Sequence, residues 1–242
     1  MNESVVLIDI NPDSVAGACA HFKSKSVPEL FYTKRIAVTH GVEHALQLLT
    51  DHLLTEGSPA LAHATGSGRI SEIVVSIGGT FVETAERTIT IDIHKPFIFT
   101  KELLDSELHN TEAISDDRIL LKEVVLSIAL NGYRTDQPFG KLVNRVEVVV
   151  LTSTIDGRLA EIVTRIVSGA YHTRALRLVA TPQVTHTVLR EMFPYEKDYA
   201  ALSTFSFLPG HFAARVKTRG DSEGDAALAM LVIYFAHAKN TQ

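Results

Sequence analysis

The sequence predicts an α/β protein in which an α+β segment interrupts an α/β core. Three observations lead to this fold class. Val5–Ile8 is a continuous apolar run, which suits a strand buried on both faces. Val42–Leu54 has apolar residues at helical spacing. Asn144–Thr152 is rich in β-branched residues at its centre, which favours a strand.

Composition limits the classes of function. The 242 residues can bury real cores, and 45% hydrophobic with 21% charged residues is an ordinary globular composition. A net charge of −5 argues against a nucleic-acid surface, which needs clustered Lys and Arg. The single Cys19 excludes an internal disulfide and fits a reducing cytoplasm. We therefore expect a cytoplasmic protein that binds no nucleic acid.

No segment suggests secretion or membrane insertion. Asp9 interrupts the first apolar run too early for a signal peptide. The longest uncharged apolar stretch is Ala226–Ala236, well short of the roughly 18–20 residues that span a bilayer. We interpret that stretch as a buried terminal helix or strand and expect membrane association to be indirect only.

The first part of the core follows from the residue pattern in order. After Val5–Ile8 a turn rich in Asn, Pro and Asp precedes a second strand at Val15–Phe22 and a third at Leu30–Val38. The amphipathic helix of Val42–Leu54 comes next. Glu56–Arg69 is rich in Gly, Ser, Pro, Ala and His, which predicts a linker and a domain boundary.

The inserted segment combines strands and one helix. Strands are predicted at Ile73–Ile77, Glu83–Ile93, Lys122–Leu130 and Asn144–Thr152, with a helix capped by Thr100 that extends to His109. The core then resumes with a helix after Asp156, a strand at Ala175–Ala180 and a helix that opens at Thr181-Pro182 and ends near Met192.

The order of these elements carries a family resemblance. Between the last two predicted strands of the insert lies a polar loop, Asn131–Gly140, that ends Asp136-Gln137-Pro138-Phe139-Gly140. This order and loop resemble the small SHS2 domain inserted into bacterial actin-like proteins of the FtsA and PilM family. The loop leans toward FtsA, which tends to carry Asp-Gly-Gln followed by Asn-Pro-x-Gly in this place.

The resemblance implies a partial actin-like (ribonuclease H-like) core with an inserted α+β SHS2-type domain. It divides the chain into a first core part at 1–70, the insert at 71–155 and a return to the core at 156–200. Residues 201–242 stay unassigned. Where the family carries its second phosphate turn, this chain has Asp198–Ser206 with no glycine. The chain thus resembles a shortened or divergent member.

The turn after the first strand carries the cofactor expectation. Actin-like ATPases wrap ATP phosphates with this turn and hold an Asp near Mg²⁺. The resemblance places Asp9 and Ser14 at matching positions and Asn11 where the family has Gly, and it implies these three as the cofactor-binding residues for ATP with Mg²⁺. Two features oppose binding: Pro12 removes a backbone donor, and Asp13 adds negative charge beside an anionic ligand. The alternative is a hairpin turn with an Asx-type hydrogen bond.

Two further patterns predict structure rather than chemistry. Ser76-Ile77-Gly78-Gly79-Thr80 lacks the leading Asp of a phosphate turn, so we interpret it as a structural glycine turn. His40 and His44 lack a third ligand, so no metal site is predicted, and no catalytic residue set is predicted either.

The resemblance implies an assembly role rather than metabolism. The main hypothesis is an FtsA-like protein that acts in the cell-division machinery through protein contacts at the inner face of the cell membrane. The alternatives are a PilM-like type IV pilus assembly protein and an ATP-binding actin-like ATPase. The expected partners are other division or pilus-assembly proteins, with self-association through the inserted domain, whose exposed strand edges suit β-augmentation.

Overall fold

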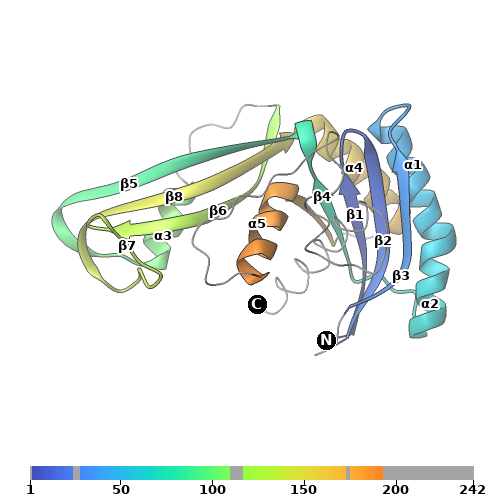
Figure 1. Ribbon diagram of the computed structural model, residues 1–242, viewed down its shortest axis with the longest axis horizontal. Coiled ribbons are helices and arrows are strands. Elements are labelled where there is room, and N and C mark those ends of the chain that lie inside the picture. The colour runs from blue at the N-terminus through green and yellow to red at the C-terminus, as the bar shows by residue number, and fades with distance from the viewer. Residues whose placement is uncertain (1, 24–27, 110–116, 173–174, 193–242) are drawn as a thin grey trace. The chain divides into compact units, whose positions relative to one another are not determined.

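The computed structural model describes residues 2–23, 28–109, 117–172 and 175–192. The chain divides into two compact units. The first comprises Met1–Val82 and Gly157–Gln242, and the second comprises Glu83–Asp156. The sequence predicted an insert at 71–155, and the second unit begins at Glu83. Each unit has its own sheet (Figure 1).

The first unit is built on a five-stranded sheet of order β3-β2-β1-β4-β9. Strands β1 and β2 pair antiparallel, as do β2 and β3, whereas β1, β4 and β9 run parallel. The predicted mixed α/β class is thus confirmed. The strands are β1 Asn2–Ile10, β2 Ser14–Lys23, β3 Glu29–Ala37, β4 Glu72–Ile77 and β9 Leu176–Ala180.

Both faces of this sheet are covered by helices, which explains the continuous apolar run in β1. Val5 and Leu7 pack with Val184 and Val188 of helix α5, which spans Thr181–Met192. On the other face α1 (Val42–His52) packs against β2 and against α4 (Gly157–Tyr171). Figure 1 shows α1 and α4 on one side of the sheet and α5 on the other.

The predicted linker at Glu56–Arg69 is wrong over most of its length. Helix α1 continues into a π-helical turn, η1 (Leu53–Gly57), and then into α2 (Ser58–Thr65). Pro59 lies in the first turn of α2, directly after the π-helical turn in which the N–H of Ser58 donates to the carbonyl of Leu53. Gly66 then ends α2 in the left-handed conformation, with φ of 73°. Only the stretch after Gly66 connects to the next strand.

The placement of Ile73–Ile77 in the insert is also wrong. This strand is β4, and it lies between β1 and β9 in the first sheet. All five residues are buried, as expected for a central strand with helices on both faces. The short run of apolar residues predicts a strand but does not state which sheet it joins, because strand pairing is decided by long-range contacts.

The second unit is a four-stranded sheet of order β5-β8-β6-β7 with one helix. One face of the sheet packs on α3 through a cluster of isoleucine, valine, leucine and phenylalanine side chains that includes Ile91, Phe99 and Leu104. Thr100 caps α3 as predicted, because its Oγ1 accepts from the N–H of Leu103 at 3.2 Å. The elements are β5 Val82–Ile98, α3 Lys101–His109, β6 Arg118–Leu130, β7 Tyr133–Arg134 and β8 Leu142–Asp156.

The polar loop that carries the FtsA resemblance is held to the end of β5. Pro138 is buried, and the Phe139 ring stacks on Phe99 with 5.5 Å between ring centroids. The N–H of Gly140 donates to the carbonyl of Phe99 at 2.8 Å, and Gly140 has φ of 78°, which favours glycine. In this unit the loop therefore has a structural role.

The return to the first unit follows the predicted elements. Helix α4 begins at Gly157, directly after Asp156, and buries Leu159, Val163 and Val167. Strand β9 and helix α5 follow, with Pro182 in the first turn of α5. Asp198–Ser206, Ala226–Ala236 and the predicted segment 201–242 lie outside the described residues.

Candidate functional site

The carboxyl ends of three parallel strands meet at one edge of the first sheet. Registers place Asp9 of β1 opposite Ser76 of β4, and Ser76 opposite Val179 of β9. Thr181 follows β9 directly. In open α/β sheets, ligands bind outside the carboxyl ends of the strands, so we expect a ligand-binding site at this edge. We call Asp9, Asn11, Ser76 and Thr181 the strand-end cluster.

Asp9 is buried, and its carboxylate is held by neighbouring side chains. It is 2% exposed, and Oδ2 accepts a hydrogen bond from Nδ2 of Asn11 at 2.7 Å. Ser76 supplies a second side-chain hydrogen bond. Burial raises the pKa of Asp9 above its ordinary value, while Ser76, the Arg35 charge and Asn11 act in the opposite direction. Desolvation is the larger effect, so the net shift of the Asp9 pKa is upward.

Ser76 connects Asp9 to Thr181. Its Oγ lies 2.8 Å from Oγ1 of Thr181, and the residue is 2% exposed. An ionised Asp9 can only accept, so in that state Ser76 donates its one proton to Asp9 and accepts the proton of Thr181. The hydrogen-bonded row thus runs across the ends of all three parallel strands. Gln183, 1% exposed, lies in the first turn of α5 after Thr181.

The turn after β1 is closed by a second turn rather than open to a ligand. The N–H of Gly78 donates to the carbonyl of Ile10 at 2.9 Å. Gly79 has φ of 61°, and a Cβ added there would lie 2.4 Å from Cδ of Pro12. The Pro12 ring therefore packs directly on Gly79. The predicted structural glycine turn at Gly78-Gly79 is confirmed.

The other side of the same turn is polar and more exposed than the strand-end cluster. Nη1 of Arg35, on β3, donates to Oγ of Ser14 at 2.5 Å. Oγ of Ser14 in turn donates to Oδ1 of Asp13 at 3.3 Å. The three residues predicted to bind a cofactor are therefore split. Asp9 and Asn11 lie in the buried cluster, whereas Ser14 lies on the outer side with Arg35 and Asp13.

These groups fit a nucleotide phosphate poorly. The N–H of Asn11 donates to the carbonyl of Ser14 at 2.9 Å, and Pro12 has no N–H. The carboxylate of Asp9 is hydrogen-bonded to Asn11 and Ser76. One atom is left over: Oδ1 of Asn11 is buried without a hydrogen-bond partner. The turn therefore has one unsatisfied acceptor, and neither Asn11 nor Pro12 offers a free backbone donor to a phosphate.

Sequence reasoning missed Ser76 and Thr181 as members of the cluster. Ser76 was noted only as the residue that replaces an Asp, and Thr181 only as the start of a helix. Nothing local identifies them, because they are 105 residues apart and meet only through the pairing of β4 with β9. A signal existed in the position of both at the end of an apolar strand.

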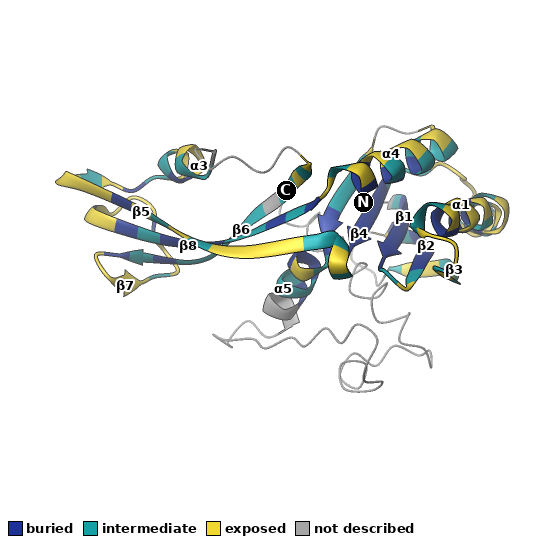
Figure 2. Cartoon of the chain, turned by 90° about the horizontal axis from the view of Figure 1, so that it is seen from above, coloured by how far each residue is buried: buried dark blue, intermediate teal, exposed yellow. Residues whose placement is uncertain are grey.

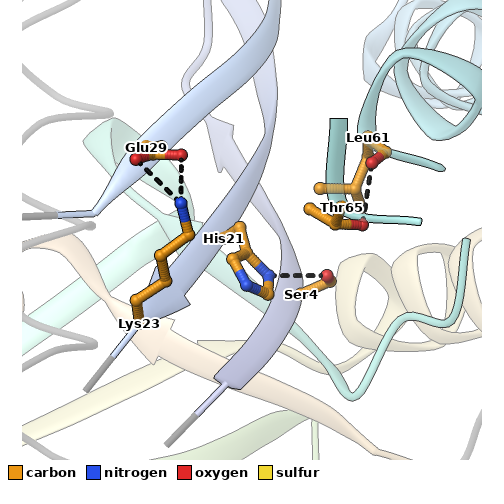
Figure 3. Close-up of polar contacts among 6 residues, drawn as sticks. All are labelled: Ser4, His21, Lys23, Glu29, Leu61 and Thr65. Atoms are coloured by element: carbon orange, nitrogen blue, oxygen red, sulfur yellow. Dashed lines mark hydrogen bonds and ion pairs between the residues drawn. The ribbon is translucent and has the colours of Figure 1, made fainter. Parts of the chain in front are cut away.

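The opposite end of the same sheet has a different character. There Oγ of Ser4 lies 3.0 Å from Nδ1 of His21, and Lys23 forms an exposed ion pair with Glu29 at 3.0 Å (Figure 3). Both are ordinary contacts between neighbouring strands, in contrast to the buried strand-end cluster.

His40 and His44 contact each other edge to face, with ring centroids 5.9 Å apart. Among the described residues, no three His, Cys, Asp or Glu side chains converge on a metal position.

The second unit offers a surface instead of a buried site. Among the described strands, β5 is an edge strand whose only neighbour is β8. It is 17 residues long, and most of its residues are exposed (Figure 2). Its apolar side chains include Ile93, 43% exposed, and Ile98, 57% exposed. An exposed edge strand presents unpaired N–H and C=O groups, which can pair with another strand.

Comparisons with known proteins identify a coarse resemblance. No family model and no curated protein matches the chain. The structure is similar to the PilM–PilN type IV pilus biogenesis complex, with 15% identity, a TM-score of 0.46, and coverage of 78% of this chain and 51% of that chain. It is also similar to the cytoplasmic domain of EpsL, an inner membrane component of the type II secretion system of Vibrio cholerae. There the identity is 7%, the TM-score 0.37 and the coverage 75% and 57%.

A third similar structure is a Bacteroides thetaiotaomicron protein with an actin-like ATPase fold and unknown function, at 9% identity, a TM-score of 0.36 and coverage of 78% and 56%. The chain thus spans about half the length of the structures it matches. None of the helices in the described ranges is long and apolar enough to cross a bilayer.

Proposed function

We propose that this chain is a component of a membrane-associated bacterial assembly, of the pilus or secretion type, and that it acts through protein contacts made by its second unit. The observation that carries the proposal is the long exposed edge of β5. Edge strands of this kind bind partners by adding a strand to the sheet. PilM–PilN and EpsL are parts of assemblies of this kind, and the proposed site of action is the cytoplasmic face of the inner membrane.

The strand-end cluster supports a role in protein–protein contacts more than it supports nucleotide binding. The carboxylate of Asp9 is already held by Asn11 and Ser76, and the Pro12 ring closes the turn against Gly79. A ligand phosphate would have to displace these packed groups. The ATP-binding alternative is favoured by one observation, the buried Oδ1 of Asn11 that has no hydrogen-bond partner.

A titration with ATP and Mg²⁺ separates these two alternatives. Ligand that binds only the folded state raises the melting temperature, and saturation by millimolar ATP gives a measurable increase. We expect no increase. An increase that Asp9→Ala abolishes, while Asp51→Ala on the exposed face of α1 keeps it, would establish nucleotide binding and contradict the scaffold proposal.

Deletion in the native host separates pilus or secretion assembly from cell division. The proposal predicts loss of surface pili or of secreted protein, with normal cell length. Filamentous cells with intact pili and secretion would instead support the FtsA-like role suggested by the Asp136–Gly140 loop. The complementing gene with β5 intact should restore the phenotype. A gene with several exposed β5 residues changed to Lys should fail to do so at equal protein level.

A further inference from the structure

The edge of β5 is self-complementary in an antiparallel pair, which points to a specific partner. Side chains alternate between the two faces of a strand. On one face Ile89 and Ile91 pack with the core of the second unit, and Ile93 follows on the same face with 43% exposure. The opposite face carries exposed polar residues: Glu86, Thr88, Thr90, Asp92 and His94. The edge therefore has an apolar row and a polar row.

A twofold axis perpendicular to the sheet pairs β5 with a second β5 in antiparallel orientation and keeps both apolar rows on the same face. If Thr90 lies on the axis, it faces Thr90 of the other copy. Ile89 then faces Ile91 twice, so four isoleucine side chains adjoin across the axis. The apolar row of one sheet continues into that of the next.

Charge selects this register over its neighbours. With Thr90 on the axis, Glu86 faces His94 twice and Thr88 faces Asp92 twice, so no like charges meet. A shift of two residues in one direction brings Arg87 opposite Lys95, and a shift in the other direction brings Glu86 opposite Asp92. Like charges directly opposite each other are destabilising in a sheet.

Pairing is limited at the end of the strand. Pro96 has no N–H to donate, and Lys95 beside it is a residue that commonly blocks edge pairing. In the register described, Pro96 would lie opposite Thr84. The complementary stretch is therefore Ala85–Lys95, which is the central part of β5.

We propose that a second copy of this chain is the partner of β5, and that the two copies pair antiparallel with Thr90 on the twofold axis. This proposal rests on the proposed function, since it names the partner of the same edge. The two sheets become one continuous eight-stranded sheet, counting four described strands from each copy. A dimer of this kind gives the assembly two identical copies of the component, related by the twofold axis.

The register is tested with a charge swap in the full chain. Sedimentation velocity of the wild type should show dimers at roughly 100 µM protein, a concentration that detects even weak self-association. His94→Glu places two Glu–Glu pairs across the axis and should weaken association by about tenfold or more. Glu86→Lys combined with His94→Glu restores two opposite-charge pairs and should restore the dimer.

Cysteine substitution tests the axis itself. Thr90→Cys should form an intermolecular disulfide under mild oxidation, because directly opposite Cβ atoms lie roughly 4.5–5.5 Å apart. Thr84→Cys is the matched control, since in this register residue 84 faces Pro96 of the other copy and lies far from residue 84 of that copy. The native Cys19 is fully buried and does not compete.

Each result decides the proposal. A wild type that stays monomeric at high concentration overturns it. A dimer that His94→Glu leaves intact, or one that Thr84→Cys links as readily as Thr90→Cys, uses a different surface and also overturns it. Monomeric protein whose gene deletion still abolishes pili or secretion leaves the proposed function standing and removes only the second copy as partner.

Discussion

The strand-end cluster of the first unit and the β5 edge of the second unit are opposites. In the cluster, polar groups lie at the ends of buried strands and bond mainly to one another, with Asp9 only 2% exposed. At the β5 edge, most residues are exposed and the strand has one neighbour among the described strands. A sheet covered by helices on both faces must satisfy its buried polar groups internally, whereas an edge strand leaves backbone groups available. Where a partner can bind thus differs between the units.

The largest expected effect tests how closely the turn after β1 packs against the glycine turn after β4, beside the strand-end cluster. Gly79→Ala should destabilise the protein by about 2–4 kcal/mol, because Ala adopts φ near 60° with strain and its Cβ would overlap the Pro12 ring. Denaturant unfolding measures the change. Gly66→Ala is the matched control: it also has positive φ but has no atom within 4 Å of the added Cβ, so we expect only about 1 kcal/mol.

Pro12→Ala in the Gly79→Ala background should recover part of the loss, because the two residues contact each other and their effects are not additive. Equal losses for Gly79→Ala and Gly66→Ala would contradict the close packing of the two turns.

The second prediction tests whether polar groups inside the second unit depend on their partners as those of the cluster do. Arg87→Ala removes the partner at 2.6 Å from Glu123, which is only 10% exposed in its side chain. Because a poorly solvated carboxylate loses its cation, we expect a loss of about 1–3 kcal/mol in unfolding experiments.

The control is Lys23→Ala, which breaks the pair with Glu29, where both side chains are about half exposed. This change should stay within about 0.5 kcal/mol. Indistinguishable losses for the two variants would mean that burial does not strengthen the Arg87–Glu123 pair.

The third prediction concerns the charge of Asp9. Since burial raises its pKa in the folded state, the stability it contributes is present below the unfolded pKa of about 3.9 and is lost as pH rises through the folded value. Asp9→Asn keeps the shape and removes the buried charge, and Oδ1 of Asn11 can accept from the new amide.

We therefore expect Asp9→Asn to melt at or above the wild-type temperature at neutral pH. The difference between the two should narrow as pH falls toward about 4. Melting curves across this range measure it. A variant that is strongly destabilised at neutral pH would mean that the ionised carboxylate is required, which would favour a cation or ligand at the cluster.

The smallest expected effect tests the openness of the edge. His94→Glu changes an exposed residue of β5, so in dilute, monomeric solution the free energy of unfolding should change by less than about 0.5 kcal/mol. The same variant should lose self-association. A large loss of stability in the monomer would mean that His94 supports the unit itself, and the contrast between edge and cluster would fail.

The sequence alone determined most of the secondary structure. Val5–Ile8, Val42–Leu54 and the strand around Val146–Val150 follow from apolar runs, helical spacing and β-branched residues, which are local properties. It also identified Gly78-Gly79 as a structural turn and Thr100 as a helix cap. It mistook Ser58–Thr65 for a linker, because Pro, Gly and Ser predict breaks even where Pro fits the first turn of a helix.

Only the tertiary structure decided which strands pair and which side chains meet. The assignment of Ile73–Ile77 to the first sheet depends on its registers with β1 and β9. The same pairing brings Ser76 to Thr181 and Asp9, and it sets the Pro12 ring against Gly79. The exposure of β5 follows from its position at the end of the strand order. These contacts join residues far apart in the chain. A local pattern carries no information about them, because strand pairing is a property of the whole fold.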